Sequence, residues 1–216
     1  MGQRVHREHF GGVVKTSGVK VGLALDYAEP DPMMLGATGE FIFLMTDGKT
    51  GEVLKHFRKK NIITRDAGII AAALFRGDLT GGLTMLAVGT GATGNLLSPD
   101  APQAGQRKLN NEIERKAFAS TTYRTAEGVA VSYRTNIVDF TTTFGESEAV
   151  GALNEMGLMV AASENPATKN PINNGPSDYD ASIDVAGFDL LANYLTFPVI
   201  SKPATAVVSI TWRLTF

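Results

Sequence analysis

Apolar and polar residues alternate along several stretches of this chain, which is the pattern of β-strands with one buried face. The strictest stretch is AVVSITWRLTF, at the C-terminal end. Its apolar positions are Val208, Ile210, Trp212, Leu214 and Phe216, and its polar positions are Ser209, Thr211, Arg213 and Thr215. We predict a terminal strand here, with Trp212 as a structural residue, that either fills a sheet or lies at a seam between subunits.

Further strands are predicted upstream. The segment EFIFLMTDGKTGEVLKHFRKKNIIT alternates from Phe41 to Met45, turns at the Gly-rich TDGKTGE and returns extended over residues 53–63. This predicts a β-hairpin. We expect antiparallel strands in three later segments. EIERKAFASTTYRT and GVAVSYRTNIVDFTTTF are rich in Thr, Val, Tyr and Phe, and the third segment is ALNEMGLMVAA.

One segment, TRDAGIIAAALFRG, has the period of an amphipathic helix. Thr64 is predicted to cap it, Asp66 favours its positive N-terminal end, and Gly77 is placed to end it. The predicted apolar face consists of Ile69, Ile70, Ala73 and Leu74.

Many short strands and a single helix predict a mainly β fold, an antiparallel, jelly-roll-like β-sandwich over residues 40–216. Residues 1–39 contain one extended stretch, GVKVGLALDY, and a Pro/Gly-rich loop. We predict that they form an extended N-terminal arm that docks on a neighbouring subunit.

Composition narrows the function. The 216 residues are 44% hydrophobic and 19% charged, as expected of one globular domain with an arm. The chain has no cysteine, which excludes disulfides, zinc–thiolate sites and thiol nucleophiles. With a net charge of −2 and no basic patch that stands out, we expect no nucleic-acid partner. The longest apolar run, AGIIAAALF, is too short to span a bilayer, so we expect no membrane partner.

The segment LAVGTGATGNLL matches the dinucleotide fingerprint G-x-G-x-x-G at Gly89, Gly91 and Gly94. In that fingerprint the third glycine opens a helix that holds a pyrophosphate. Here the helix precedes the glycines, and Pro99 and Pro102 interrupt the residues after them. We interpret the glycines as a turn between strands that needs positive φ, and expect no cofactor.

The sequence gives as little support for a metal site as for a nucleotide site. Asp178, Asp180 and Asp184 alternate in DYDASID, but an EF-hand loop would need glycine in place of Ile183 and glutamate in place of Asp189. A solvated loop is the favoured interpretation, with adventitious calcium as the alternative. The neighbouring histidines His6 and His9 have no third ligand nearby, so we expect no metal there.

Two glutamates, Glu112 in LNNEIERK and Glu155 in LNEMGLM, are candidates for an acid/base pair. The alternative, which we favour, is a structural ion pair or turn cap; the available arginines are Arg115, Arg124 and Arg134. The chain has no G-x-S-x-G, H-E-x-x-H or P-loop motif. We therefore expect no enzymatic activity.

The order of these segments resembles the N-terminal, baseplate- or neck-attaching domain of the tail-collar fibre proteins of tailed bacteriophages. In that family a similar helix leads to AVGDG-like glycines, an L-x-N-E-x-x-R segment, an I-x-E-x-G-L strand and a closing strand after K-P. The matching positions are Ala87–Gly91, Leu109, Asn111, Glu112, Arg115, Leu153, Glu155, Gly157, Leu158, Lys202 and Pro203. The resemblance covers roughly residues 62–216.

This resemblance implies a structural virion protein of the tail, collar, neck or baseplate, with itself (as a homo-oligomer) and other virion proteins as partners. It implies no catalytic residues, and its interface or structural residues are Gly89, Gly91, Gly94, Glu112, Arg115, Glu155, Gly157 and Trp212. A fibre would continue into a shaft and a receptor-binding tip, whereas this chain stops at Phe216. The alternatives are a capsid-decorating protein and a calcium-assisted carbohydrate-binding module.

Overall fold

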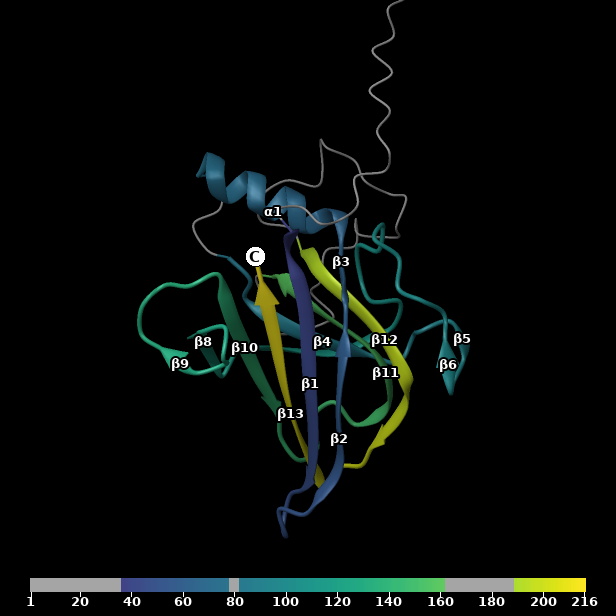
Figure 1. Cartoon of the computed structure of the whole chain (residues 1–216). Coiled ribbons are helices and arrows are strands. Elements are labelled where there is room, and N and C mark those ends of the chain that lie inside the picture. Colours follow the sequence, from purple (N-terminus) through teal and green to yellow (C-terminus); the bar gives the residue numbers. More distant parts are fainter. Residues whose placement is uncertain (1–35, 78–81, 162–188) are drawn as a thin grey trace, which may run out of the picture. The chain divides into compact units, whose positions relative to one another are not determined.

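The computed structural model describes residues 36–77, 82–161 and 189–216, all within one compact unit that begins at Pro32. These residues form two large antiparallel β-sheets, a small two-stranded ribbon and one helix (Figure 1). The strands of the six-stranded sheet A are, in spatial order, β2 (Val53–Lys60), β1 (Thr38–Asp47), β13 (Ala206–Thr215), β10 (Ile137–Phe144), β8 (Ser120–Arg124) and β9 (Ala130–Val131). The five-stranded sheet B has the order β3 (Ile62–Ile63), β12 (Leu190–Lys202), β11 (Gly151–Val160), β4 (Met85–Gly89) and β7 (Glu112–Ala117). The mainly β, antiparallel sandwich predicted from the sequence is confirmed.

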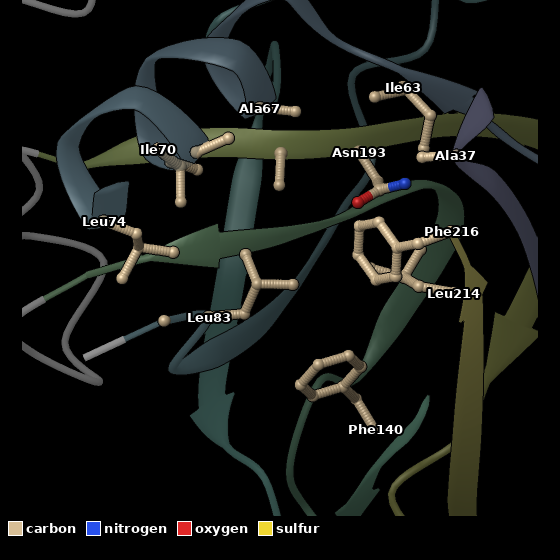
Figure 2. A pocket seen from close by; sticks show the side chains of 13 residues that line it. Ala37, Ile63, Ala67, Ile70, Leu74, Leu83, Phe140, Asn193, Leu214 and Phe216 are labelled. Carbon is tan, nitrogen blue, oxygen red and sulfur yellow. The ribbon is translucent and has the colours of Figure 1, made fainter. Parts of the chain in front are cut away.

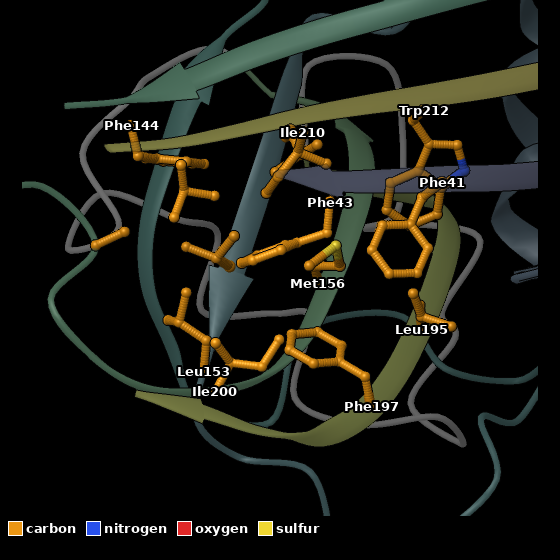
Figure 3. Packing of buried hydrophobic residues seen from close by; sticks show 14 of the residues in the cluster. Phe41, Phe43, Phe144, Leu153, Met156, Leu195, Phe197, Ile200, Ile210 and Trp212 are labelled. Atoms are coloured by element: carbon orange, nitrogen blue, oxygen red, sulfur yellow. The ribbon is translucent and has the colours of Figure 1, made fainter. Parts of the chain in front are cut away.

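Aromatic and aliphatic side chains from both sheets fill the space between them (Figure 3). Sheet A contributes Phe41, Phe43 and Trp212, and sheet B contributes Met156 and Phe197; all five are fully buried. The ring centroids of Phe41 and Trp212 lie 6.0 Å apart. This aromatic cluster is the main hydrophobic core of the sandwich.

The terminal strand behaves as its alternation predicts. Residues of β13 are buried and half-buried in turn along its whole length. The strand pairs with β1 on one side and β10 on the other, so it fills the middle of sheet A. Phe216, just past its end, is 54% exposed.

Sheet B contains a long strand that the sequence analysis did not predict. Strand β12 spans Leu190–Lys202, and its first eight residues are all buried. Helix α1 (Arg65–Arg76) covers part of its outer face, where Ile70 packs on Leu190 and Ala192. Because a strand covered on both faces is apolar at consecutive positions, it has no alternation to reveal it.

The helix ends as predicted and begins differently. Gly77 has φ 84° and donates its N–H to the carbonyls of Ala73 and Leu74, which closes the helix. The Thr64 hydroxyl, predicted to cap the other end, donates instead to the carbonyl of Leu191. This bond to β12 holds the start of the helix on sheet B. A side-chain cap would instead bond to a backbone N–H of the helix itself.

The predicted face of the helix is also corrected. Asp66 is buried, and the Nε of Arg107 lies 3.1 Å from its Oδ1. Ile70 is buried as predicted, but Leu74 is 41% exposed because it lines an open pocket. No helix among the described residues is long and apolar enough to cross a membrane.

The extended region predicted around Val129–Tyr133 is the weakest of the predicted strands. Only Ala130 and Val131 form a strand, which pairs with two residues of β8 at the edge of sheet A. Val129 and Tyr133 are 60% and 61% exposed. Alternation without a partner surface does not extend a strand here.

Candidate functional site

The glycine-rich bend after β4 contacts a buried carboxylate, that of Glu155 on β11. The N–H of Gly91 donates to Glu155 Oε1 at 2.9 Å, and the N–H of Asn111 donates to the same oxygen at 2.8 Å. The N–H of Asn110 and the hydroxyl of Tyr194 donate to Oε2 at 3.0 and 2.7 Å. Glu155 has no exposed surface. Its charge is therefore held by four donors of the protein itself.

Strand pairing places this carboxylate. Strand β11 lies between β4 and β12, and Glu155 is opposite Gly89 of β4 and Thr196 of β12. Met156 and Leu158, one and three residues further along β11, pack in the core between the sheets. Glu155 is therefore on the other face of sheet B, next to the bend after β4 and residues 110–111. We call this group of Gly91, Asn110, Asn111, Glu155 and Tyr194 the Glu155 junction.

The Tyr194 hydroxyl acts as a hydrogen-bond donor within the Glu155 junction. Burial, together with the neighbouring Glu155 carboxylate, raises the pKa of Tyr194. The phenol therefore remains a protonated donor to Glu155 across the physiological range. Its proton is held in the internal hydrogen bond to Glu155.

The glycines are required by close packing at the junction. A Cβ on Gly91 would lie 2.3 Å from the backbone nitrogen of Asn111, and one on Gly89 would lie 2.6 Å from the Asn111 carbonyl oxygen. Neither glycine has positive φ, so the expected reason for them was wrong, whereas Gly94, at φ 87°, matches it. After Gly94 the chain forms a small ribbon of β5 (Gly94–Asn95) and β6 (Ser98–Pro99).

Gly157 is also required by close packing, in this case between two neighbouring strands of sheet B. A Cβ on Gly157 would lie 2.5 Å from Cδ1 of Leu191 and 2.6 Å from the carbonyl oxygen of Asn193. Both contacts belong to β12, the strand that pairs with β11. Gly157 is therefore a structural residue of the same face of sheet B as Glu155.

We predict that Gly91→Ala lowers the free energy of unfolding by about 2–3 kcal/mol, because the new methyl group would have to displace the Asn111 backbone. Urea unfolding followed by fluorescence of Trp212, the one tryptophan of the chain, measures the change. Gly82→Ala is the matched control, since a Cβ there meets nothing within 4 Å. Equal stability of the two variants would contradict the close-packing explanation.

Glu112 has a different set of partners from Glu155. The Nε and Nη2 of Arg115 donate to the two oxygens of Glu112, and Nη1 donates to Asp189 Oδ2 at 2.7 Å. Burial alone lowers the pKa of Arg115, but its bonds to Glu112 and Asp189 outweigh this and raise the pKa. The structure thus places Glu112 in a buried ion pair, the alternative that the sequence analysis favoured, and not in an acid/base pair with Glu155.

The remaining candidates from the sequence are less informative. Asp178, Asp180 and Asp184 lie outside the described residues, as do His6 and His9. Within residues 36–77, 82–161 and 189–216, no three acidic or histidine side chains are grouped to hold a metal ion. Arg124 pairs with Asp139, which also binds Arg213.

An apolar pocket of about 240 Å³ lies between helix α1 and the ends of strands in both sheets (Figure 2). Ile70 and Leu74 of the helix face Phe140, Leu214 and Phe216 across it. Its one polar lining side chain is the amide of Asn193, whose Nδ2 has no hydrogen-bond partner in the described part of the chain. Among the described residues that line it there is no acid, base or nucleophile, and the pocket can hold an apolar group.

A basic strand, missed in the sequence analysis, forms one edge of sheet A. Within β2 the side chains of Lys55, His56, Arg58, Lys59 and Lys60 are exposed. The expectation that no basic patch stands out is therefore wrong. The run KHFRKK carried the signal, but the whole-chain charge of −2 averages it away.

Three of the motifs that carry the phage resemblance meet at the Glu155 junction. The bend of AVGTG, the backbone of LNNEIER and the carboxylate of LNEMGL are joined by hydrogen bonds. No protein-family model and no curated protein matches the chain.

Proposed function

We propose that this protein is a structural virion component of a tailed bacteriophage, located at the tail, collar, neck or baseplate, that acts through contacts between subunits. The supporting observation is that three of the resemblance motifs, AVGTG, LNNEIER and LNEMGL, meet at the Glu155 junction. Gly91 and Glu155 are 64 residues apart and are hydrogen-bonded. Short motifs that matched by chance would have no reason to meet in space, whereas parts of one shared fold would.

The partners of the buried charged side chains support the proposal of a structural role. Glu155 is held by backbone N–H groups and a tyrosine, and Glu112 is held by Arg115. Asp139 accepts hydrogen bonds from Arg124 and Arg213. Apart from the Glu112–Arg115 pair, which lies within β7, these ionic groups connect different segments of the sheets, which makes the domain rigid. A rigid domain of this kind suits an assembly in which neighbours repeat the same contacts.

The surface of sheet A supports assembly as well. Among the described strands β2 is at the edge of sheet A and pairs on one side only, and its residues other than Phe57 are exposed. An open strand edge presents unpaired N–H and C=O groups that a neighbouring subunit can complete. The domain therefore offers a surface for strand addition.

The proposal predicts that the protein is a stoichiometric part of the particle. Phage particles purified from an infected culture should contain it after density-gradient separation, and labelled antibody should bind at the tail, collar, neck or baseplate. Mass spectrometry of the gradient fractions and electron microscopy measure these two results. Labelling over the head surface would instead support capsid decoration, and presence only in the free protein fraction would refute a virion role.

A further inference from the structure

Strand β2 has one free edge. Its backbone pairs with β1 over Lys60 to Val53, and no other described strand pairs with it. The register shifts once, between Met45 and Thr46 of β1, so that the regular part of β2 runs from Lys55 to Lys60. On the far side of this part, alternate N–H and C=O groups point outward without a partner strand.

The side chains of this regular part form two basic rows. His56, Arg58 and Lys60 share one face, and Lys55 and Lys59 share the other with the half-buried Phe57 between them. None of the five basic side chains forms an ion pair within the described residues. The Nζ of Lys59 donates to the carbonyl of Thr196 at 2.8 Å, which leaves its charge uncompensated. The edge therefore combines unpaired backbone groups with unpaired positive charge.

A second copy of β2 does not fit this edge. In either orientation, pairing β2 with itself over Lys55–Lys60 sets basic residues opposite basic residues. Like charges directly opposite each other destabilise a strand pair. The basic rows therefore exclude self-pairing and leave the edge open to a partner of opposite charge.

The two basic rows on opposite faces of β2 favour a β-strand over a nucleic acid as that partner. A nucleic-acid backbone is a single track of charge, and it would follow one row while the other pointed away from it. A β-strand alternates its side chains with the same period of two, so acidic residues on a strand beside β2 would face both rows. Phe57 adds a place for one apolar side chain among the acidic ones.

We propose that the free edge of β2 binds an extended acidic segment of a different protein by β-strand addition. Backbone hydrogen bonds to Lys55–Lys60 supply the pairing, and acidic side chains on both faces supply the selectivity. This inference rests on the proposed function in one respect only, which is that the partner is expected to be a neighbouring virion protein.

The test uses the full chain and a fluorescein-labelled peptide of sequence TEEEVEEETS. We expect saturable binding by fluorescence anisotropy that is at least about tenfold tighter than for TQQQVQQQTS, which has the same shape without charge. Hydrogen exchange should slow at the outward amides of β2 when the acidic peptide is bound. N-methylation of the peptide amides that face β2 should abolish binding, because strand addition needs those donors.

Arg58→Glu should weaken peptide binding by about tenfold or more, because it places a negative charge among the acidic side chains. Arg134→Glu makes the same change of charge at an exposed residue off β2 and should leave the affinity unchanged. Thermal unfolding of both variants shows that each is folded.

Three results would overturn the inference: no saturable binding of the acidic peptide, equal binding of its N-methylated form, or a single-stranded DNA oligonucleotide that binds more tightly and is equally sensitive to Arg58→Glu. The last result would make β2 a nucleic-acid surface. Each of these outcomes is independent of whether the protein is found in phage particles, so the two proposals fail separately.

Discussion

Replacing Glu155 with alanine is expected to lower the free energy of unfolding by about 3–5 kcal/mol. The substitution removes the acceptor of three backbone N–H groups and of the Tyr194 hydroxyl. These donors lie around a side chain with no exposed surface, so the variant would leave them short of partners. Urea unfolding monitored by Trp212 fluorescence measures the loss.

Three further variants make this prediction specific. Glu155→Gln keeps the shape but turns an amide donor toward donors, so it should also destabilise the protein. Glu52→Ala removes a carboxylate from an exposed turn and should change stability by less than about 0.5 kcal/mol. Tyr194→Phe should cost less when Glu155 is already alanine than in the natural sequence, because the two side chains share a hydrogen bond. A loss below about 1 kcal/mol for Glu155→Ala would show that the junction is not a stabilising element.

Trp212→Ala is expected to cost a similar amount, about 3–5 kcal/mol, through the cavity that it leaves. Trp212 is fully buried in the middle of sheet A and contacts Phe41 in the core (Figure 3). The substitution should also broaden the unfolding transition if the sheets repack loosely. Because it removes the only tryptophan, far-ultraviolet circular dichroism replaces fluorescence in this measurement.

Two matched variants separate packing from hydrogen bonding at Trp212. Its Nε1 has no hydrogen-bond partner within the described residues, so Trp212→Phe gives up no bond and should cost much less than Trp212→Ala. Phe216→Ala truncates an aromatic side chain of the same strand row that is 54% exposed, and should cost less than about 1 kcal/mol. If Phe216→Ala were as damaging as Trp212→Ala, the core would extend past the end of β13.

Local patterns located some polar residues of the candidate site but not their partners. Glu112 and Glu155 were singled out, and Arg115 was named among the arginines available to them. The actual donors to Glu155 are backbone groups of Gly91, Asn110 and Asn111. Every residue except proline carries a backbone N–H, so nothing in the sequence marks which of these groups will face a carboxylate.

The sequence alone determined the strands with one buried face and the end of the helix. The rows of β1 and β13 and the stop at Gly77 follow from side-chain alternation and from glycine's tolerance of positive φ, which are local properties. Only the tertiary structure decided that β12 is a strand, that the glycine bend meets Glu155, and that the basic run lies on an open edge. These three features depend on which segments, distant in the chain, lie side by side. A strand buried on both faces, a close backbone approach and a sheet edge without a neighbour produce no periodic pattern in the sequence.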